Sequence, residues 1–143
     1  MMKSFRTLSL KEKFTVFSLW LQLALVDIRL TLLPYKFNKN WIYGLPKRQR
    51  KHKNIGKDEI KLLTQMTQIA GSHSLFFNMT CLRKALVIRS RLRKFGMEAL
   101  LKFGTRKIED KQQKNYHTHV WLDLEGEVID PTNNTLAYRE FNN

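Results

Sequence analysis

The hydrophobic positions in the first third of the chain follow a helical pattern. Ser9-Leu10-Lys11-Glu12 has the S-x-x-E form of a capping box, in which the Ser9 and Glu12 side chains satisfy backbone N–H groups at a helix start. Pro34 ends the pattern, so the sequence predicts a helix over about Leu10–Leu33. Nearly every face of its middle is apolar, so this helix must pack into the core, onto a partner or onto lipid.

A second helix is predicted over about Asp58–Ala70, where hydrophobic residues recur at three-residue steps. These residues are Ile60, Leu63, Met66 and Ile69. Gly71 follows, and glycine readily adopts the left-handed conformation that ends a helix. Between the two helices, residues 35–57 mix aromatic, glycine, proline and cationic side chains without a period, which predicts an irregular connector.

A third helix is predicted to begin near Cys81. Asn78 or Thr80 can cap its start, and Gly96 stands where a left-handed stop is needed. The hydrophobic side chains, which fall mostly on one side, are Leu82, Ala85, Leu86, Leu92 and Phe95. The other faces carry Arg83, Lys84, Arg89, Arg91, Arg93 and Lys94. We expect this basic face to be solvated or to dock a partner.

The pattern then changes from helical spacing to alternation. Glu98–Gly104 predicts a strand, Thr105–Asn115 a polar loop, and His117–Pro131 two strands around a turn at Glu125-Gly126. The sequence therefore predicts an α+β fold, in which helices precede antiparallel strands.

The turn decides which side chains share a face of this hairpin. If Glu125 and Gly126 are its central residues, Trp121 lies opposite Asp130, and His119 reaches Asp130 along the diagonal. Asp123 shares that face but lies roughly 13 Å along the strand from His119. Asp130 is therefore the better carboxylate to orient His119.

Cys81 is the one cysteine of the chain, which excludes an internal disulfide and a thiolate-rich zinc site. At a helix start the thiolate form of a cysteine is favoured, and a histidine held by a carboxylate can accept its proton. Cys81, His119 and Asp130 are therefore a candidate catalytic set. By residue type alone, a lone cysteine beside Leu82 is more often a core residue, and both interpretations stay open.

The net charge of +14 is concentrated at the N-terminal end. Residues 1–57 hold 13 Lys/Arg and 2 Asp/Glu, or +11, whereas residues 58–143 hold 13 and 10, or +3. We therefore expect an apolar helix with a basic connector over 1–57 and a separate domain over 58–143. The basic cluster Lys47–Lys53 could bind nucleic acid or an anionic membrane. No nucleic-acid motif is present, so we expect no nucleic-acid partner.

The N-terminal apolar tract is a weak candidate for a membrane span. Asp27 and Arg29 interrupt it, leaving fewer than the roughly 20 apolar residues that a span needs. No small-x-small cleavage site of a signal peptide follows it. We expect a cytoplasmic protein that can contact the inner membrane surface.

The motifs around Cys81 and His119 resemble those of the standalone transglutaminase-like leader peptidases of lasso peptide biosynthesis, the protease half of the split B protein. The matching residues are Cys81-Leu82, Ala85-Leu86, Leu92-Arg93 with Gly96, Gly104-Thr105-Arg106, Thr118-His119-Val120-Trp121 and Asp130. Thr118 and Val120 replace the alanines usual in that family, and the loop before His117 is expanded.

This resemblance implies a transglutaminase-like, papain-like core with Cys81, His119 and Asp130 as the catalytic triad. The implied activity is that of a cysteine protease that removes the leader from a ribosomally made precursor peptide without metal or other cofactor. A separate leader-recognition protein and an asparagine-synthetase-like cyclase are the implied partners. Transfer of the acyl group to an amine, as in true transglutaminases, and a non-catalytic basic binding module are the alternatives. His73 and His117 are expected to be structural.

Overall fold

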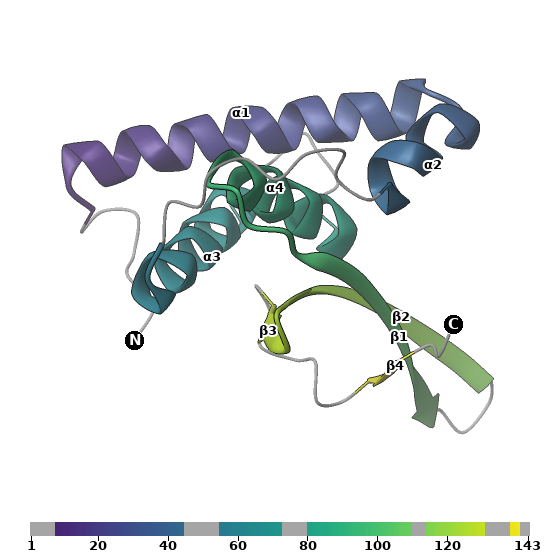
Figure 1. The fold of residues 1–143 in the computed structure, drawn as a ribbon. Coiled ribbons are helices and arrows are strands. Elements are labelled where there is room, and N and C mark those ends of the chain that lie inside the picture. Colours follow the sequence, from purple (N-terminus) through teal and green to yellow (C-terminus); the bar gives the residue numbers. More distant parts are fainter. Residues whose placement is uncertain (1–7, 45–54, 73–79, 110–113, 131–137, 141–143) are drawn as a thin grey trace.

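The computed structural model describes residues 8–44, 55–72, 80–109, 114–130 and 138–140. The elements are α1 (Leu10–Leu32), α2 (Tyr35–Tyr43), α3 (Lys57–Ser72), α4 (Cys81–Lys94), β1 (Leu100–Glu109), β2 (Lys114–Leu124), β3 (Glu127–Ile129) and β4 (Arg139–Glu140). In Figure 1 the long helix α1 lies across the top, α3 and α4 pack beneath it, and the sheet lies below them. The α+β fold class expected from the sequence is confirmed.

Helix α1 begins and ends where its sequence predicts. The Ser9 backbone N–H donates to Glu12 Oε2 over 2.8 Å, and the Glu12 N–H donates to Ser9 Oγ over 3.3 Å, so the capping box forms. The inner side of α1 is buried through Val16, Leu19, Leu23 and Val26. These four residues join one hydrophobic core with α3 and α4.

Helix α2 occupies part of the segment in which an irregular connector was expected, so that prediction was wrong for Tyr35–Tyr43. Contacts with the end of α1 hold this helix. Asn38 Nδ2 donates to the Leu33 carbonyl over 3.0 Å, Arg29 Nε donates to Asn38 Oδ1 over 3.3 Å, and the Arg29 guanidinium lies 4.5 Å from the centre of the Trp41 ring. Asn38 and Ile42 are buried. The hydrophobic residues of the segment have no helical spacing, so the sequence pattern did not predict these contacts. The basic cluster Lys47–Lys53 lies outside the described residues.

Helix α3 matches its predicted range, but Gly71 lies inside the helix instead of ending it. The reason is close packing. A Cβ atom at position 71 would lie 2.6 Å from Cε of Lys84, so the glycine lets the Lys84 side chain from α4 pass directly over the α3 backbone.

Helix α4 begins at Cys81 with Thr80 as its N-cap residue, and the other capping candidate, Asn78, lies outside the described residues. The Thr80 side chain makes no capping bond, because its Oγ1 accepts from Arg83 over 3.2 Å. Gly96, with φ 83°, follows the helix, and its N–H and that of Met97 bond carbonyls of the last turn. The predicted glycine stop is therefore confirmed.

The sequence had led us to expect that the basic face of α4 is solvated or docks a partner. In the structure most of its arginines instead bind α1 and α2. Arg83 Nε lies 2.6 Å from Asp27 Oδ1, and Arg91 donates to Gln22 and Ser18. Arg89 is only 4% exposed and donates to the Ile42 and Gly44 carbonyls at the end of α2. Arg93 donates to the same Gly44 carbonyl. The cations therefore fix α4 against the other helices.

Two hydrophobic clusters meet at α4. Its Leu86 and Val87 pack with α1 and α3. Its Ala85, Ile88 and Leu92 pack with strand residues of β2 and β3. Because opposite sides of one helix are buried, α4 joins the helical layer to the sheet.

The sheet has the strand order β3-β2-β1-β4. Leu124 pairs with Glu127 and Leu122 with Ile129, which confirms the predicted hairpin register. The turn residues Glu125 (φ 53°) and Gly126 (φ 87°) are both left-handed, as a two-residue hairpin turn requires. The predicted loop Thr105–Asn115 was wrong at both ends, because β1 continues to Glu109 and β2 begins at Lys114. Backbone pairing between the two strands stabilises these residues, although most of their side chains are polar.

We predict that Leu23→Ala destabilises the protein far more than Leu25→Ala, two residues away in α1. Leu23 is fully buried and Leu25 is 58% exposed. Removing the Leu23 side chain should lower the free energy of unfolding by about 2–5 kcal/mol, and removing that of Leu25 by less than about 0.5 kcal/mol. Urea unfolding of both variants measures this difference. Equal losses would contradict the packing of α1 on the domain.

Candidate active site

Cys81 occupies the first position of α4, where backbone N–H groups have no partner within the helix. Its side chain is partly buried and packs against the cluster that contains Val120 and Ile129. In the sequence, Val120 directly follows His119, and Ile129 directly precedes Asp130. The packing of α4 on the sheet therefore brings Cys81 to strands β2 and β3, which carry the other two candidates. Side chains alternate along a strand, so His119 and Asp130 lie on the sheet face opposite Val120 and Ile129.

His119 and Asp130 form a buried pair. His119 Nε2 lies 2.8 Å from Asp130 Oδ2, and the two residues are 3% and 7% exposed. The contact follows from the register, because Leu122 opposite Ile129 puts Asp130 across from Trp121, one diagonal from His119. With Nε2 bonded to the carboxylate, Nδ1 is the ring nitrogen that can exchange a proton with a thiol.

Aromatic rings enclose the imidazole of His119. The centre of the Trp121 ring lies 6.0 Å away and that of Tyr138 lies 4.8 Å away. Gly104 makes room for Trp121, since a Cβ there would lie 2.7 Å from Cη2 of the indole. The sequence did not point to Tyr138, because only the pairing of β4 with β1 brings this residue to the site.

The sequence also did not single out Lys84, which sets a cation near Cys81. Burial against α3 lowers the pKa of the Lys84 ammonium group, while its attraction to Cys81 acts in the opposite direction. The Lys84 Nζ donates to Gln68 Oε1 over 2.8 Å. The sequence did contain a signal for the proximity of Lys84 to Cys81, because residues three apart in a helix are neighbours on its surface.

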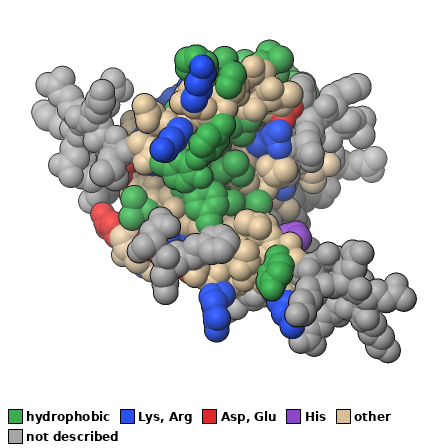
Figure 2. Space-filling model, turned by 90° about the vertical axis from the view of Figure 1, so that its right-hand side faces the viewer, with side chains coloured by type: hydrophobic (Ala, Val, Ile, Leu, Met, Phe, Trp, Pro, Cys, Tyr) green, Lys and Arg blue, Asp and Glu red, His purple; other side chains and the backbone are tan. Residues whose placement is uncertain are grey.

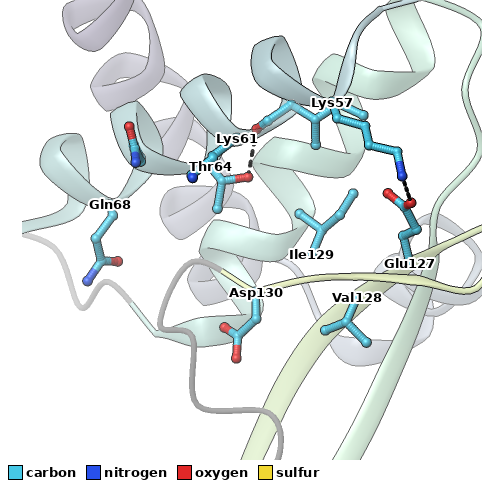
Figure 3. A pocket seen from close by; sticks show the side chains of 10 residues that line it. Lys57, Lys61, Thr64, Gln68, Glu127, Val128, Ile129 and Asp130 are labelled. Atoms are coloured by element: carbon cyan, nitrogen blue, oxygen red, sulfur yellow. Dashed lines mark hydrogen bonds and ion pairs between the residues drawn. The ribbon is translucent and has the colours of Figure 1, made fainter. Parts of the chain in front are cut away.

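A groove of about 300 Å³ lies between α3 and β3. Figure 3 shows α3 residues along one wall, with Thr64 and Gln68 among them, and Glu127 to Asp130 along the other. At one end Lys57 forms an ion pair with Glu127, and this interaction raises the pKa of the Lys57 ammonium group. Because Asp130 lines the groove, one end of the groove adjoins the buried His119–Asp130 pair.

The remaining histidines have the following places. His117 is exposed, and its Nδ1 lies 2.8 Å from the Tyr138 hydroxyl oxygen. His52 and His73 lie outside the described residues. Within the described parts of the chain, no group of three or more His, Cys, Asp or Glu side chains is arranged to hold a metal ion.

Comparison with known proteins identifies the family. A family model described as the transglutaminase-like superfamily matches residues 22–143 and so extends from within α1 to the end of the chain. No curated protein and no solved structure matches the chain significantly. A partly buried cysteine at a helix start, packed on a sheet that carries a His–Asp pair, agrees with that match. The chain belongs to the transglutaminase-like superfamily.

Proposed function

We propose that this protein is a cysteine protease that removes the leader peptide from a lasso peptide precursor. Membership of the superfamily supports cysteine protease or acyltransferase activity in general. The observation that carries the proposal is the buried contact of His119 Nε2 with Asp130 Oδ2, at 2.8 Å, in a sheet against which Cys81 packs. The motif resemblance around Cys81 and His119 supplies the substrate class.

In the proposed acylation step, His119 Nδ1 takes the proton of the Cys81 thiol while Asp130 holds the imidazole. The sulfur attacks the carbonyl carbon of the last leader residue, and the backbone N–H of Cys81 stabilises the resulting oxyanion. The imidazolium then protonates the departing amine of the core peptide as the C–N bond breaks. The leader stays on Cys81 as a thioester.

In the second step, water attacks the thioester carbonyl and gives a proton to His119. The C–S bond breaks, and the proton held by His119 returns to the Cys81 sulfur. The leader leaves as a carboxylic acid that loses its remaining proton to water. The freed amine of the core peptide is the nucleophile that a macrolactam-forming cyclase needs. The proposed partners are therefore the precursor, a leader-recognition protein and an asparagine-synthetase-like cyclase, with the reaction taking place in the cytoplasm.

The groove beside Asp130 supports a peptide substrate. Its α3 wall presents the Thr64 hydroxyl and the Gln65 and Gln68 amides, which can bond peptide groups. In the described sheet β3 is an edge strand, since the order is β3-β2-β1-β4. An extended peptide can add to such an edge through backbone hydrogen bonds.

We predict that Cys81→Ala abolishes cleavage of the precursor and that Asp130→Asn lowers kcat/KM by roughly 100- to 10,000-fold. Without its carboxylate partner, His119 loses the orientation and the charge stabilisation that Asp130 provides. Purified protein is incubated with precursor and leader-recognition protein, and the products are identified by mass spectrometry. Equal cleavage by wild type and Cys81→Ala would refute the proposal.

Asp123→Asn is the matched control for this experiment. Asp123 lies in the same hairpin, but its Oδ1 accepts from the Gly126 N–H at the turn, 2.8 Å away. Asparagine can accept the same bond, so cleavage should stay within about twofold of wild type. A product in which the leader is joined to an added amine would identify acyl transfer instead of hydrolysis.

We predict that His119→Ala slows alkylation of Cys81 by iodoacetamide at pH 7 by about tenfold or more, because the imidazole no longer accepts the thiol proton. Asp123→Asn is the control, since Asp123 lies on the same strand and its carboxylate bonds the turn at Gly126. Mass spectrometry of the intact protein follows the rate. Equal rates in the two variants would show that His119 does not act on Cys81, whatever the substrate.

A further inference from the structure

Large apolar side chains form an exposed line along the outer side of α1, here called the α1 stripe. The stripe comprises Leu10, Phe14, Phe17, Leu21, Leu25, Ile28 and Leu32. Their exposed fractions range from 45% for Ile28 to 85% for Leu10. Tyr35 and Phe37 of α2 add exposed aromatic area next to the end of the stripe. An apolar surface of this length that is exposed to solvent indicates an interaction site.

The α1 stripe is separate from the side of α1 that fills the core. Leu19 and Leu23 are fully buried in the cluster shared with α3 and α4, and Asp27 forms an ion pair with Arg83. By length and composition alone, α1 could cross a membrane. Crossing would remove Leu19 and Leu23 from the core and put Asp27 in hydrocarbon, which is costly. The structure therefore favours a helix that lies along a surface.

The spacing of the stripe keeps its side chains on one side of α1. From Leu10 to Leu32 the stripe advances 22 residues in six steps, about 3.7 residues per step. A left-handed two-stranded coiled coil needs a 3.5-residue repeat, whereas a straight helix has 3.6 residues per turn. The α1 stripe therefore stays on one side of a straight helix, as contact with a plane requires. The same 11-residue spacing occurs in right-handed coiled coils, so the choice between a membrane and a partner helix depends on the charges around the stripe.

Most of the charged side chains around the stripe are positive. Between residues 8 and 44 the cations are Lys11, Lys13, Arg29, Lys36 and Lys39, and the acids are Glu12 and Asp27. Both acids are engaged within the protein, Glu12 in the capping box and Asp27 with Arg83. Figure 2 shows the molecule from the α2 end, where hydrophobic side chains gather with Lys and Arg side chains beside them. Apolar and cationic groups together complement an anionic lipid surface.

We propose that α1 lies in the plane of an anionic membrane, with the α1 stripe in the boundary between headgroups and acyl chains. The flanking Lys and Arg side chains contact lipid phosphates. The opposite side of α1 remains packed on α3 and α4, so the folded domain sits on the membrane surface without a spanning segment.

The full-length protein is tested by sedimentation with phosphatidylglycerol–phosphatidylcholine vesicles and with phosphatidylcholine vesicles. We expect binding to the anionic vesicles, weakened by added salt, and at least tenfold weaker binding to the neutral ones. Leu21→Ser/Leu25→Ser should lower the vesicle partition coefficient on the order of 100-fold, because each lost apolar side chain is worth about tenfold or more.

Leu62→Ser/Leu100→Ser is the matched control, since Leu62 and Leu100 are exposed leucines of α3 and β1, at 38% and 48%. This control should bind vesicles like wild type. Lys11→Glu/Lys39→Glu, which leaves the stripe intact, should bind anionic vesicles at least tenfold more weakly. Far-UV circular dichroism verifies that each variant is folded.

Three outcomes would overturn the proposal. The first is equal vesicle binding by the stripe and control variants, and the second is equal binding to anionic and neutral vesicles. The third is that the wild type is a dimer in lipid-free solution and the stripe variant is a monomer. The last outcome would assign the stripe to a second copy of the chain. Cleavage of the precursor in lipid-free solution is measured in parallel, so a failure of the membrane proposal is distinguishable from a failure of the protease proposal.

Discussion

The arrangement of the helices depends on the hydrogen bonds between the buried guanidinium of Arg89 and the end of α2. A cation that is 4% exposed requires acceptors, and the Ile42 and Gly44 carbonyls at the end of α2 provide them. Burial lowers the pKa of Arg89, and the neighbouring Arg93 acts in the same direction. The benefit is mutual, because the last carbonyls of a helix have no partners within it. The end of α2 and the middle of α4 therefore hold each other in place.

This mutual capping has a consequence for the candidate active site. Arg89 holds one side of α4 to α2, and Arg83 and Arg91 hold it to α1. Ala85 and Ile88 of the same helix pack into the cluster of β2 and β3. The helix can neither rotate nor slide without breaking one of these sets of contacts. Cys81, at the start of α4, is thereby held at a fixed place beside the strands that carry His119 and Asp130.

Local signals in the sequence were sufficient where the physical cause was local. The capping box at Ser9, the glycine stop at Gly96 and the left-handed turn at Glu125-Gly126 each depend on a few neighbouring residues, and all were predicted correctly. The hairpin register in turn made the contact of His119 with Asp130 predictable, because pairing follows from the turn by counting.

The features that the sequence did not reveal depend on contacts that no local pattern shows. Helix α2 is held by Arg29 and by the distant Arg89, and Tyr138 by the pairing of β4 with β1. The far half of β1 pairs with the start of β2, which is close in the chain, but its mostly polar side chains did not indicate a strand. The arginines of α4 looked like a solvated face because a helical pattern shows charge but not which partner neutralises it. Gly71 looked like a stop because the pattern does not show that Lys84 crosses α3 there.

Gly104 limits how the sheet around the histidine can vary. Gly104 pairs with His119 in the sheet. The Trp121 ring packs against Gly104, and the Arg139 carbonyl oxygen would lie 2.8 Å from an added Cβ. The space that a side chain at this position would need is therefore already filled by the indole and the β4 backbone. Even one methyl group would have to displace a ring or a strand. Redesign of this wall of the site therefore has to treat Gly104, Trp121 and β4 as a single unit.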